Sequence, residues 1–447
     1  MVDPSSKSVL NIKTIQKEDE ALVKIEQIDD AGNLVEKGAV SRPVHAVDKD
    51  VTVSVGPSIY EATERIKKLL WNHYAGNLHG SDVYWSWGAG RTDLELTEWW
   101  AFATEVPGYH LIVAGDDMLM IHTHFGDCKH WDRKHLTFFE GDLSQCDHTS
   151  KLDCLFAQYV TEQYLGVSEE VIRIQLANAR AKLVVSLNAK SNETITVLRS
   201  YERNTGGTDT TFGNSCTSIT AAMYALATSP LANSTSKCWC SYATRHGTDQ
   251  IAQEFQEAYE RLGLSLKLKI FSPMGEGFVH CRLPTFLKGT WYPVTRTADV
   301  PFDRVWGPLP SRLLKLGKTL NDPTQTMKLH PKEQVPLEEA LVRFSSSLAF
   351  SVKDFMWPLG IKEWLNKLIP PAFVPFETNH LLDSYVLKTM TGSFAYATAD
   401  SLCHAELAKY YGVSTELWID FMLHLQKIRP FMTSCHPVWF ALAQDYA

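Results

Sequence analysis

Residues 113–121 read VAGDDMLMI, which places two adjacent aspartates between two apolar runs. Both runs have the composition of buried strands, so the pattern predicts a strand, a tight turn and a second strand over residues 111–125. Ionised carboxylates at such a turn destabilise the fold unless a cation compensates their charge. The stretch therefore predicts a cation site at the turn, with Asp116 and Asp117 beside it.

A second acidic segment, EGDLSQCDHTS, covers residues 140–150. Asp142 ends an apolar strand expected over residues 136–145, and Asp147 follows where a helix expected over residues 149–166 begins. If the two strand tips meet, three carboxylates gather, and such a cluster needs hard divalent cations. Oxygen ligands favour Mg²⁺ or Mn²⁺ over Zn²⁺, and two such ions suit phosphoryl transfer. Taken alone, each acidic segment is equally well a solvated turn or a chance spacing.

A third segment, TGGTDTTFGNS, covers residues 205–215. Its glycines free the backbone to approach a phosphate or a base. Asn214 lies one helical turn beyond Thr210, and an amide that faces Asp147 suits a ribose 2′-hydroxyl, which both donates and accepts a hydrogen bond. A Gly-rich entrance to a helix with a capping threonine accounts for the same residues.

Bulk composition limits the function classes. The chain has 447 residues and a net charge of −8, so two or three lobes are expected and a uniformly basic nucleic-acid binder is excluded. Nine cysteines without a disulfide framework indicate a reducing compartment. The N-terminal residues have no apolar region typical of a signal peptide, and no apolar run is long enough to span a membrane.

Helix and strand patterns alternate in the middle of the chain, and helices dominate from about residue 295. This order indicates an α+β core followed by a helical C-terminal lobe. The other expected elements are two strands around a turn over 21–56, helices over 58–76 and 168–184, a Gly-rich loop that runs into a helix over 205–226, a helix and a strand over 248–271, and a hairpin over 277–294.

These three segments resemble the A, B and C motifs of viral RNA-dependent RNA polymerases. Motif A is D-x4-D at 142–147, motif B is [S/T]-G-x3-T-x3-N-[S/T] at 205–215, and motif C is the strand–GDD–strand. Further stretches are similar to the basic motif F (21–47), to motif D (248–271) and to the hairpin of motif E (277–289).

The order of the motifs departs from most of these enzymes, because GDD precedes D-x4-D. The chain thus resembles the permuted C-A-B polymerases of permutotetraviruses and birnaviruses. Birnaviruses have ADN where this chain has GDD, so its motif C is more similar to that of permutotetraviruses. An unpermuted chain carries the GDD hairpin after the motif B helix. Here residues 229–247, SPLANSTSKCWCSYATRHG, are polar and unsuited to a buried hairpin.

The resemblance implies an α+β right-hand polymerase with fingers, palm and thumb and an antiparallel palm sheet, with motif C preceding motif A. The implied divisions are fingers with motif F at 1–105, palm at 106–166, a fingers insertion at 167–204, palm at 205–294 and a helical thumb at 295–447. The implied activity is RNA-templated RNA synthesis by nucleotidyl transfer on a viral genome.

The resemblance also implies residue roles. Asp116 and Asp142, assisted by Asp117, hold two Mg²⁺ or Mn²⁺ ions. A general acid protonates the leaving pyrophosphate; Lys267 and Lys269 share one strand face, and distance from the preceding helix favours Lys269. Nucleotide binding is assigned to Asp147, Thr205, Gly206, Thr210 and Asn214 near the sugar, and to Lys24, Lys37 and Arg42 on the triphosphate. The implied partners are an RNA template and product strand, nucleoside triphosphates and other viral replication proteins, in the cytoplasm of an infected host cell or in a virion.

Two alternatives remain open. The segment HTHFGDCKHWDRKH has zinc-ligand spacing and is similar to the HxHxDH of metallo-hydrolases, although Asp127 sits one position late. The candidate zinc ligands are His122, His124, Cys128, His130 and His135. The second alternative is a non-catalytic RNA-binding protein with a polymerase-like fold. Stoichiometric zinc would favour the hydrolase, and dependence on Mg²⁺ or Mn²⁺ would favour the polymerase.

Overall fold

The structure is a computed structural model. It describes residues 11–16, 24–28, 34–37, 43–47, 49–125, 134–144, 146–180, 182–186, 194–197, 201, 203, 207–229, 245–271, 283–315, 342, 346, 349–350, 352–369, 394, 397–428 and 435–446. The chain divides into two compact units. Unit 1 contains Met1–Lys17, Ser41–Gly90 and Phe102–His280, and unit 2 contains Glu18–Val40, Arg91–Ala101 and Cys281–Ala447.

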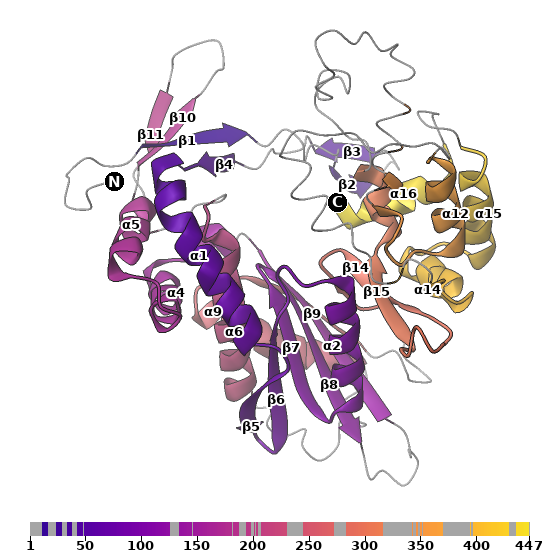
Figure 1. The fold of residues 1–447 in the computed structure, drawn as a ribbon, viewed down its shortest axis with the longest axis horizontal. Helices are drawn as coiled ribbons and strands as arrows, with labels where there is room; N and C mark the ends of the chain where they lie inside the picture. Colours follow the sequence, from indigo (N-terminus) through magenta and orange to yellow (C-terminus); the bar gives the residue numbers. More distant parts are fainter. Residues whose placement is uncertain are drawn as a thin grey trace. The chain divides into compact units, whose positions relative to one another are not determined.

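Unit 1 is built on a six-stranded sheet in the order β12-β9-β8-β7-β6-β5 (Figure 1). The expected strands at 111–125, 136–145 and 265–271 are confirmed. The strands are β5 (His73–Leu78), β6 (Ser81–Trp87), β7 (Gly108–Ala114), β8 (Asp117–Phe125), β9 (Lys134–Leu143) and β12 (Leu266–Phe271).

The strands within the ranges expected for the palm, β7, β8, β9 and β12, pair antiparallel as expected, but the sheet as a whole is not antiparallel. The strands β6 and β7 pair in parallel, whereas the other neighbours in this sheet pair antiparallel. The helix α2 (Asp93–Glu105) lies between β6 and β7 in the chain, and such a helical crossover returns the second strand in the same direction as the first. The sheet is therefore mixed, and the fold is α+β with mixed sheets.

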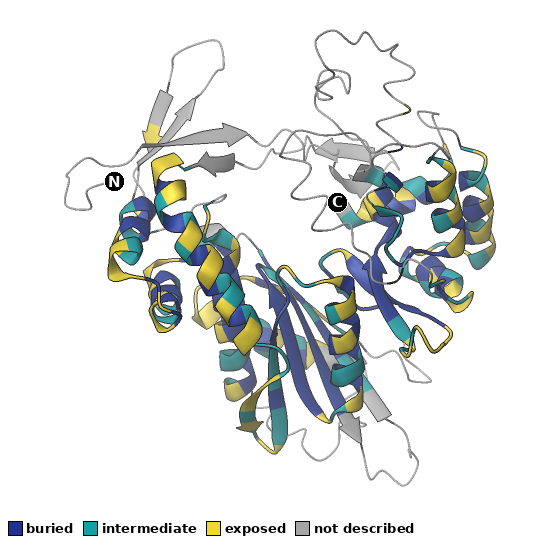
Figure 2. Ribbon diagram, viewed as in Figure 1, coloured by how far each residue is buried: buried dark blue, intermediate teal, exposed yellow. Residues whose placement is uncertain are grey.

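Helices of unit 1 cover one face of this sheet. The helix α6 packs on β7, α9 packs on β12 and α1 contacts β6. The hydrophobic core joins buried side chains of α6 and α9, such as Phe212 and Phe255, to alternate residues of the strands. Figure 2 shows the strands as mostly buried and the outer surface of α1 as exposed. The helices are α1 (Lys49–Leu69), α3 (Cys146–Thr149), α4 (Leu152–Tyr164), α5 (Glu169–Ala179), α6 (Thr210–Thr228) and α9 (Arg245–Arg261).

The predicted helix over 58–76 was wrong at both ends. α1 begins at Lys49, and residues 73–78 form β5. Val51, Val55 and Ile59 recur on one buried face of α1, so packing against the core outweighs the low helix propensity of valine. The predicted helix over 168–184 likewise ends at Ala179.

A second sheet of unit 1 has the order β11-β10-β1-β4. Its strand β10 occupies the end of the stretch expected to be helical, because the Leu-Val-Val run pairs in parallel with β1. The strands are β1 (Asn11–Gln16), β4 (Pro43–Ala46), β10 (Lys182–Ser186) and β11 (Thr194–Val197).

Unit 2 combines small sheets with helices. The expected strands on either side of DDAGN form a hairpin of β2 (Lys24–Ile28) and β3 (Leu34–Lys37). A three-stranded sheet follows the order β13-β14-β15, in which β15 was not expected and the start of the predicted hairpin, 277–282, lies outside the described residues. Its strands are β13 (Thr285–Phe286), β14 (Gly289–Pro293) and β15 (Arg304–Pro308).

Among the described residues, helices dominate the C-terminal part of unit 2, as expected. Their core is rich in fully buried large aromatic side chains, including Trp357 and Trp418. No helix among the described residues is both long and apolar enough to cross a membrane. The helices are α12 (Leu359–Lys367), α14 (Leu402–Tyr410), α15 (Thr415–Leu425) and α16 (Val438–Ala443), with short 3-10 turns at Pro310–Lys315 and Gln444–Tyr446.

Candidate active site

The Gly-Asp-Asp stretch forms a two-residue hairpin turn between β7 and β8. Ala114 and Asp117 are the last pair of the ladder, so Gly115 and Asp116 make the turn. Gly115 has a φ of +68°, the left-handed region that favours glycine. Type II′ hairpin turns place glycine at this first position, which explains why glycine precedes the two aspartates.

The β9 acid lies beside this turn. Asp142 is the direct Cα partner of Asp117 in the antiparallel ladder of β8 and β9. The backbone N–H of Leu143 donates to the carbonyl oxygen of Asp116 at 3.2 Å. The structure thus brings the predicted residues Asp116, Asp117 and Asp142 to one end of the sheet, and all three are partly exposed.

A strand with two lysines, β12, lies beside these acids. Lys267 of β12 is the Cα partner of Asp142, and Lys269 is the partner of Glu140. Direct cross-strand partners point to one face of a sheet, so Asp117, Asp142 and Lys267 share a face. Their sequence neighbours Met118, Leu143 and Leu266 belong to the core on the other face. The register places Lys267, rather than the favoured Lys269, next to the acids, and both lysines are exposed.

The paired carboxylates of Asp117 and Asp142 fit a hard divalent cation. Two like charges directly opposite each other in a sheet are destabilising, and a cation between them removes the repulsion. In the part of the chain that the structure describes, no three His, Cys, Asp or Glu residues form a preformed metal-binding group. Mg²⁺ usually takes only one or two carboxylates and completes its shell with water and substrate phosphates. The donor set therefore suits Mg²⁺ or Mn²⁺ that arrives with a phosphorylated substrate.

The helix α6 holds the turn through two serines. The N–H of Gly115 donates to Ser215 Oγ at 2.8 Å, and Ser218 Oγ donates to the carbonyl oxygen of Gly115 at 2.8 Å. Ser215 Oγ in turn donates to the carbonyl oxygen of Thr211. The sequence interpretation quoted Ser215 only as part of a pattern and missed Ser218. The spacing S-x-x-S on a helix, which puts both hydroxyls on one face, was the available signal.

Asn214 is anchored inside unit 1. Its side chain is only 5% exposed, and Oδ1 accepts a hydrogen bond from Arg203 Nη1 at 2.5 Å. The same nitrogen donates to Ser150 Oγ at 2.8 Å. Asp147 belongs to α3, just before Ser150, and its side chain is outside the described part. A sugar-reading pair of Asp147 and Asn214 therefore stays a prediction, while Arg203 is a residue that the sequence interpretation missed.

A buried polar network extends from Arg203. Its Nη2 donates to Gln158 Oε1 at 2.9 Å, and Gln158 Nε2 donates to Glu162 Oε1 at 2.7 Å and to Asp209 Oδ2 at 3.1 Å. Gln175 Nε2 donates to the second oxygen of Glu162 at 2.8 Å. Burial raises the pKa of Glu162 to about 7, although hydrogen bonds from the two glutamines and the charge of Arg203 act in the opposite direction.

Gly213 makes room for this network. A Cβ atom at this position would lie 2.1 Å from Gln158 Oε1 and 2.7 Å from Arg203 Nε. Any larger residue would push the arginine and the glutamine away from α6. The glycine that precedes Asn214 is thus explained by close approach of side chains, not by the backbone flexibility that the sequence interpretation assigned to the glycines of 205–215.

The remaining nucleotide-binding predictions are only partly described. Thr210 is the first residue of α6 and is partly exposed. Lys24 and Lys37 are Cα partners in the β2–β3 hairpin of unit 2, and their side chains are not described. Thr205, Gly206 and Arg42 lie outside the described residues.

The proposed zinc ligands receive no support from the part that is described. His122 is buried and stacks on the Tyr109 ring with centroids 4.2 Å apart, which is a packing role. His124 and His135 are Cα partners whose side chains are not described. Cys128 and His130 lie outside the described residues.

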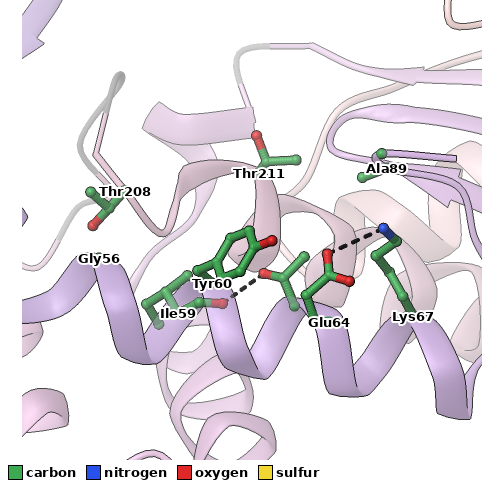
Figure 3. Close-up of a pocket in the computed structure, with 10 residues that line it drawn as sticks. Gly56, Ile59, Tyr60, Glu64, Lys67, Ala89, Thr208 and Thr211 are labelled. Carbon is green, nitrogen blue, oxygen red and sulfur yellow. Dashed lines mark hydrogen bonds and ion pairs between the residues drawn. The ribbon is translucent and has the colours of Figure 1, made fainter. Parts of the chain in front are cut away.

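A pocket of about 370 Å³ lies between α1 and the loop that enters α6 (Figure 3). Thr208 and Thr211 line one side of it and Tyr60 the other. Lys67 closes one end through an ion pair with Glu64 at 3.2 Å. Its lining is continuous with the Gly-rich segment, but hydroxyls and one neutralised ion pair define no particular ligand.

Comparisons with known proteins give a limited match. No protein-family model matches the chain, and no curated protein sequence matches it. A solved structure described as the X-ray structure of the birnavirus VP1-VP3 complex matches with a TM-score of 0.33 and 10% sequence identity. The alignment covers 64% of this chain and 34% of the birnavirus chain, so the chain spans about a third of the length of that relative.

Proposed function

We propose that this protein is an RNA-dependent RNA polymerase whose palm motifs follow the permuted order C, A, B. The observation that carries the proposal is the ladder pairing of Asp117 with Asp142 beside the Gly115–Asp116 turn. The GDD turn and the strand that ends at Asp142 were identified separately in the sequence, and their carboxylates lie at the same end of the sheet. Neighbouring strand ends with paired carboxylates are what two-metal nucleotidyl transfer requires.

The chain's own residues have distinct tasks in this proposal. Asp116, Asp117 and Asp142 would hold the divalent ions, and Ser215 and Ser218 keep the turn in place. Bound Mg²⁺ or Mn²⁺ supplies activation of the attacking primer hydroxyl and stabilises the leaving oxygen. Lys267 stands next to Asp142, where its ammonium group can donate a proton to pyrophosphate. Asn214 and Asp147 would recognise the ribose 2′-hydroxyl.

The test is primer extension on an RNA template with Mg²⁺ or Mn²⁺, comparing the wild type with Asp116→Ala and Asp142→Ala. Loss of a metal ligand should lower the rate by roughly 100-fold or more. Asp153→Ala, at an exposed position of α4, is the matched control and should keep the wild-type rate. Extension that survives both active-site substitutions would exclude the mechanism.

A stability measurement separates catalysis from folding. Without divalent ions, Asp142→Ala should stay folded with a stability close to that of the wild type, because the relief of its repulsion with Asp117 offsets the loss of its attraction to Lys267. A folded wild type that extends no primed template with either ion would favour the non-catalytic RNA-binding alternative.

A further inference from the structure

A single guanidinium nitrogen joins the two segments that carry the proposed sugar-reading residues. Arg203 Nη1 donates to Ser150 Oγ at 2.8 Å and to Asn214 Oδ1 at 2.5 Å. Ser150 Oγ also donates to the carbonyl oxygen of Cys146 at 2.7 Å, and Cys146 directly precedes Asp147. The arginine therefore links the turn around Asp147 to the N-terminal part of α6, the helix that carries the B pattern.

Arginine also decides which way the Asn214 amide points. A guanidinium group only donates hydrogen bonds, so the amide must turn its oxygen toward Arg203. The NH₂ end then points away from the arginine, and it is the end that the proposed sugar contact requires. The flip of an asparagine amide is set by such partners, and a sugar hydroxyl that accepts a hydrogen bond needs the donor end.

The arginine itself is rigidly held. It is 2% exposed, and its second terminal nitrogen donates to Gln158 Oε1 at 2.9 Å and to Thr217 Oγ1 at 3.5 Å. A buried cation is tolerated only when nearby groups compensate it, and Gln158 connects it to Glu162 and Asp209. The planar guanidinium group of arginine donates to several acceptors in fixed directions. Lysine cannot replace it, because its ammonium group is a point charge without this planar arrangement.

We propose that Arg203 is a positioning residue for sugar selection: it orients the Asn214 amide and sets the spacing between Asn214 and the Asp147 segment. This inference rests on the proposed polymerase function. Arg203 contacts no reacting group, and it acts through Asn214 and Ser150.

The test compares incorporation of a ribonucleotide and of the matching 2′-deoxynucleotide by primer extension with Arg203→Lys. We expect ribonucleotide kcat/KM to fall about tenfold, the effect of one charge-assisted hydrogen bond, while deoxynucleotide kcat/KM stays within about twofold of wild type. The selection ratio then falls about tenfold. A merely structural role would lower both values together and leave the ratio unchanged.

Two more variants keep the test decisive if Arg203→Lys does not fold. Ser150→Ala removes one acceptor of Arg203 Nη1 and should also lower the selection ratio of ribonucleotide over deoxynucleotide. Thr217→Val removes the weak contact of Arg203 Nη2 and the hydrogen bond from the Thr217 hydroxyl to the Gly213 carbonyl oxygen, but it leaves both partners of Arg203 Nη1 in place. It serves as the control, with a ratio near wild type. Asn214→Asp keeps an acceptor for Arg203 but has no NH₂ donor, so it should lose selection while remaining stable.

The outcomes separate the two proposals. A wild type that extends no RNA primer overturns the polymerase function and this inference with it. An active, selective wild type together with folded Arg203→Lys and Ser150→Ala variants of unchanged selection ratio overturns only the role of Arg203.

Discussion

The backbone N–H of Gly115 donates a hydrogen bond to Ser215 Oγ at 2.8 Å, across 100 positions of the chain. Ser218 of the same helix binds the carbonyl oxygen of Gly115, so both polar groups of one turn residue are tied to α6. A hairpin tip held in this way cannot rotate relative to the helix. The helix that carries the B pattern therefore locates the two aspartates that follow Gly115.

Ser218→Ala tests this connection. The substitution removes the hydrogen bond to the Gly115 carbonyl oxygen, so the free energy of unfolding should fall by about 1 kcal/mol. A turn that is less well held should also lower the rate of nucleotide addition about 3- to 10-fold. Urea denaturation and primer extension measure the two effects.

Thr220→Ala is the matched control for Ser218→Ala. Thr220 lies on the exposed side of α6, and its hydroxyl donates only to the helix carbonyl of Cys216 among the hydrogen bonds described. Its loss should leave the rate of nucleotide addition unchanged. Equal losses of rate in both variants would contradict the role assigned to Ser218.

The two strand lysines are predicted to differ in importance. Lys267 pairs with Asp142, whereas Lys269 pairs with Glu140, two residues or roughly 7 Å farther from the turn. Lys267→Met should lower the rate of nucleotide addition by about 10- to 100-fold, the usual range for loss of a general acid. Lys269→Met should change it by less than about threefold. The reverse ranking in single-turnover measurements would return the role to Lys269.

Gly213→Ala should destabilise the protein although it lies in a helix. Alanine normally stabilises a helix relative to glycine by up to about 1 kcal/mol. Here the new Cβ would lie 2.1 Å from Gln158 Oε1, so overpacking should reduce the free energy of unfolding by about 1–3 kcal/mol.

Gly56→Ala in α1 is the control, and its effect on the free energy of unfolding should have the opposite sign. Its Cβ would meet Thr208 Cγ2 at 3.8 Å, an ordinary contact, so a gain of about 0.5–1 kcal/mol is expected. Chemical denaturation of both variants checks the pair. A stabilised Gly213→Ala protein would show that the network can move away from α6.

The buried carboxyl of Glu162 predicts a pH dependence. Its pKa rises from 4.5 to about 7 on folding because of burial, so the folded state binds more protons than the unfolded state between these values. Stability must then fall as pH rises from about 4.5 to 7 and stay constant above that range. Glu162→Gln should remove this dependence, so the difference in free energy of unfolding between the variant and the wild type should shift by about 3 kcal/mol in favour of the variant between pH 4.5 and pH 8.

Denaturation curves from pH 5 to 8 for wild type, Glu162→Gln and the exposed control Glu257→Gln measure this effect. Burial lowers the pKa of His110 to about 4, which makes stability rise with pH up to about 6.5 in every variant. The difference between wild type and Glu162→Gln cancels that contribution. A difference that does not change with pH would show that Glu162 is ionised throughout the range.

The local pattern predicted the strands of the candidate site better than the helices. Alternating apolar runs and a Gly-Asp-Asp turn define β7 and β8, because a two-residue hairpin sets its own register. The start of α1 was missed because its valines favour strands locally and only the core selects the helix. The parallel pairing of β6 and β7 was missed because the direction of a strand depends on the path of the connecting helix.

By itself, the sequence determined which acids lie at strand ends and that the GDD turn precedes the second acidic segment, since turn chemistry and strand periodicity act between near neighbours. Only the tertiary structure decided that Lys267 pairs with Asp142 and that Arg203 joins Ser150 to Asn214. The residues of each pair lie on separate elements, and a hydrogen bond to a buried arginine leaves no periodic trace in the chain. Such contacts arise only when separate parts of the chain pack together, because packing selects partners by shape and burial rather than by distance along the chain.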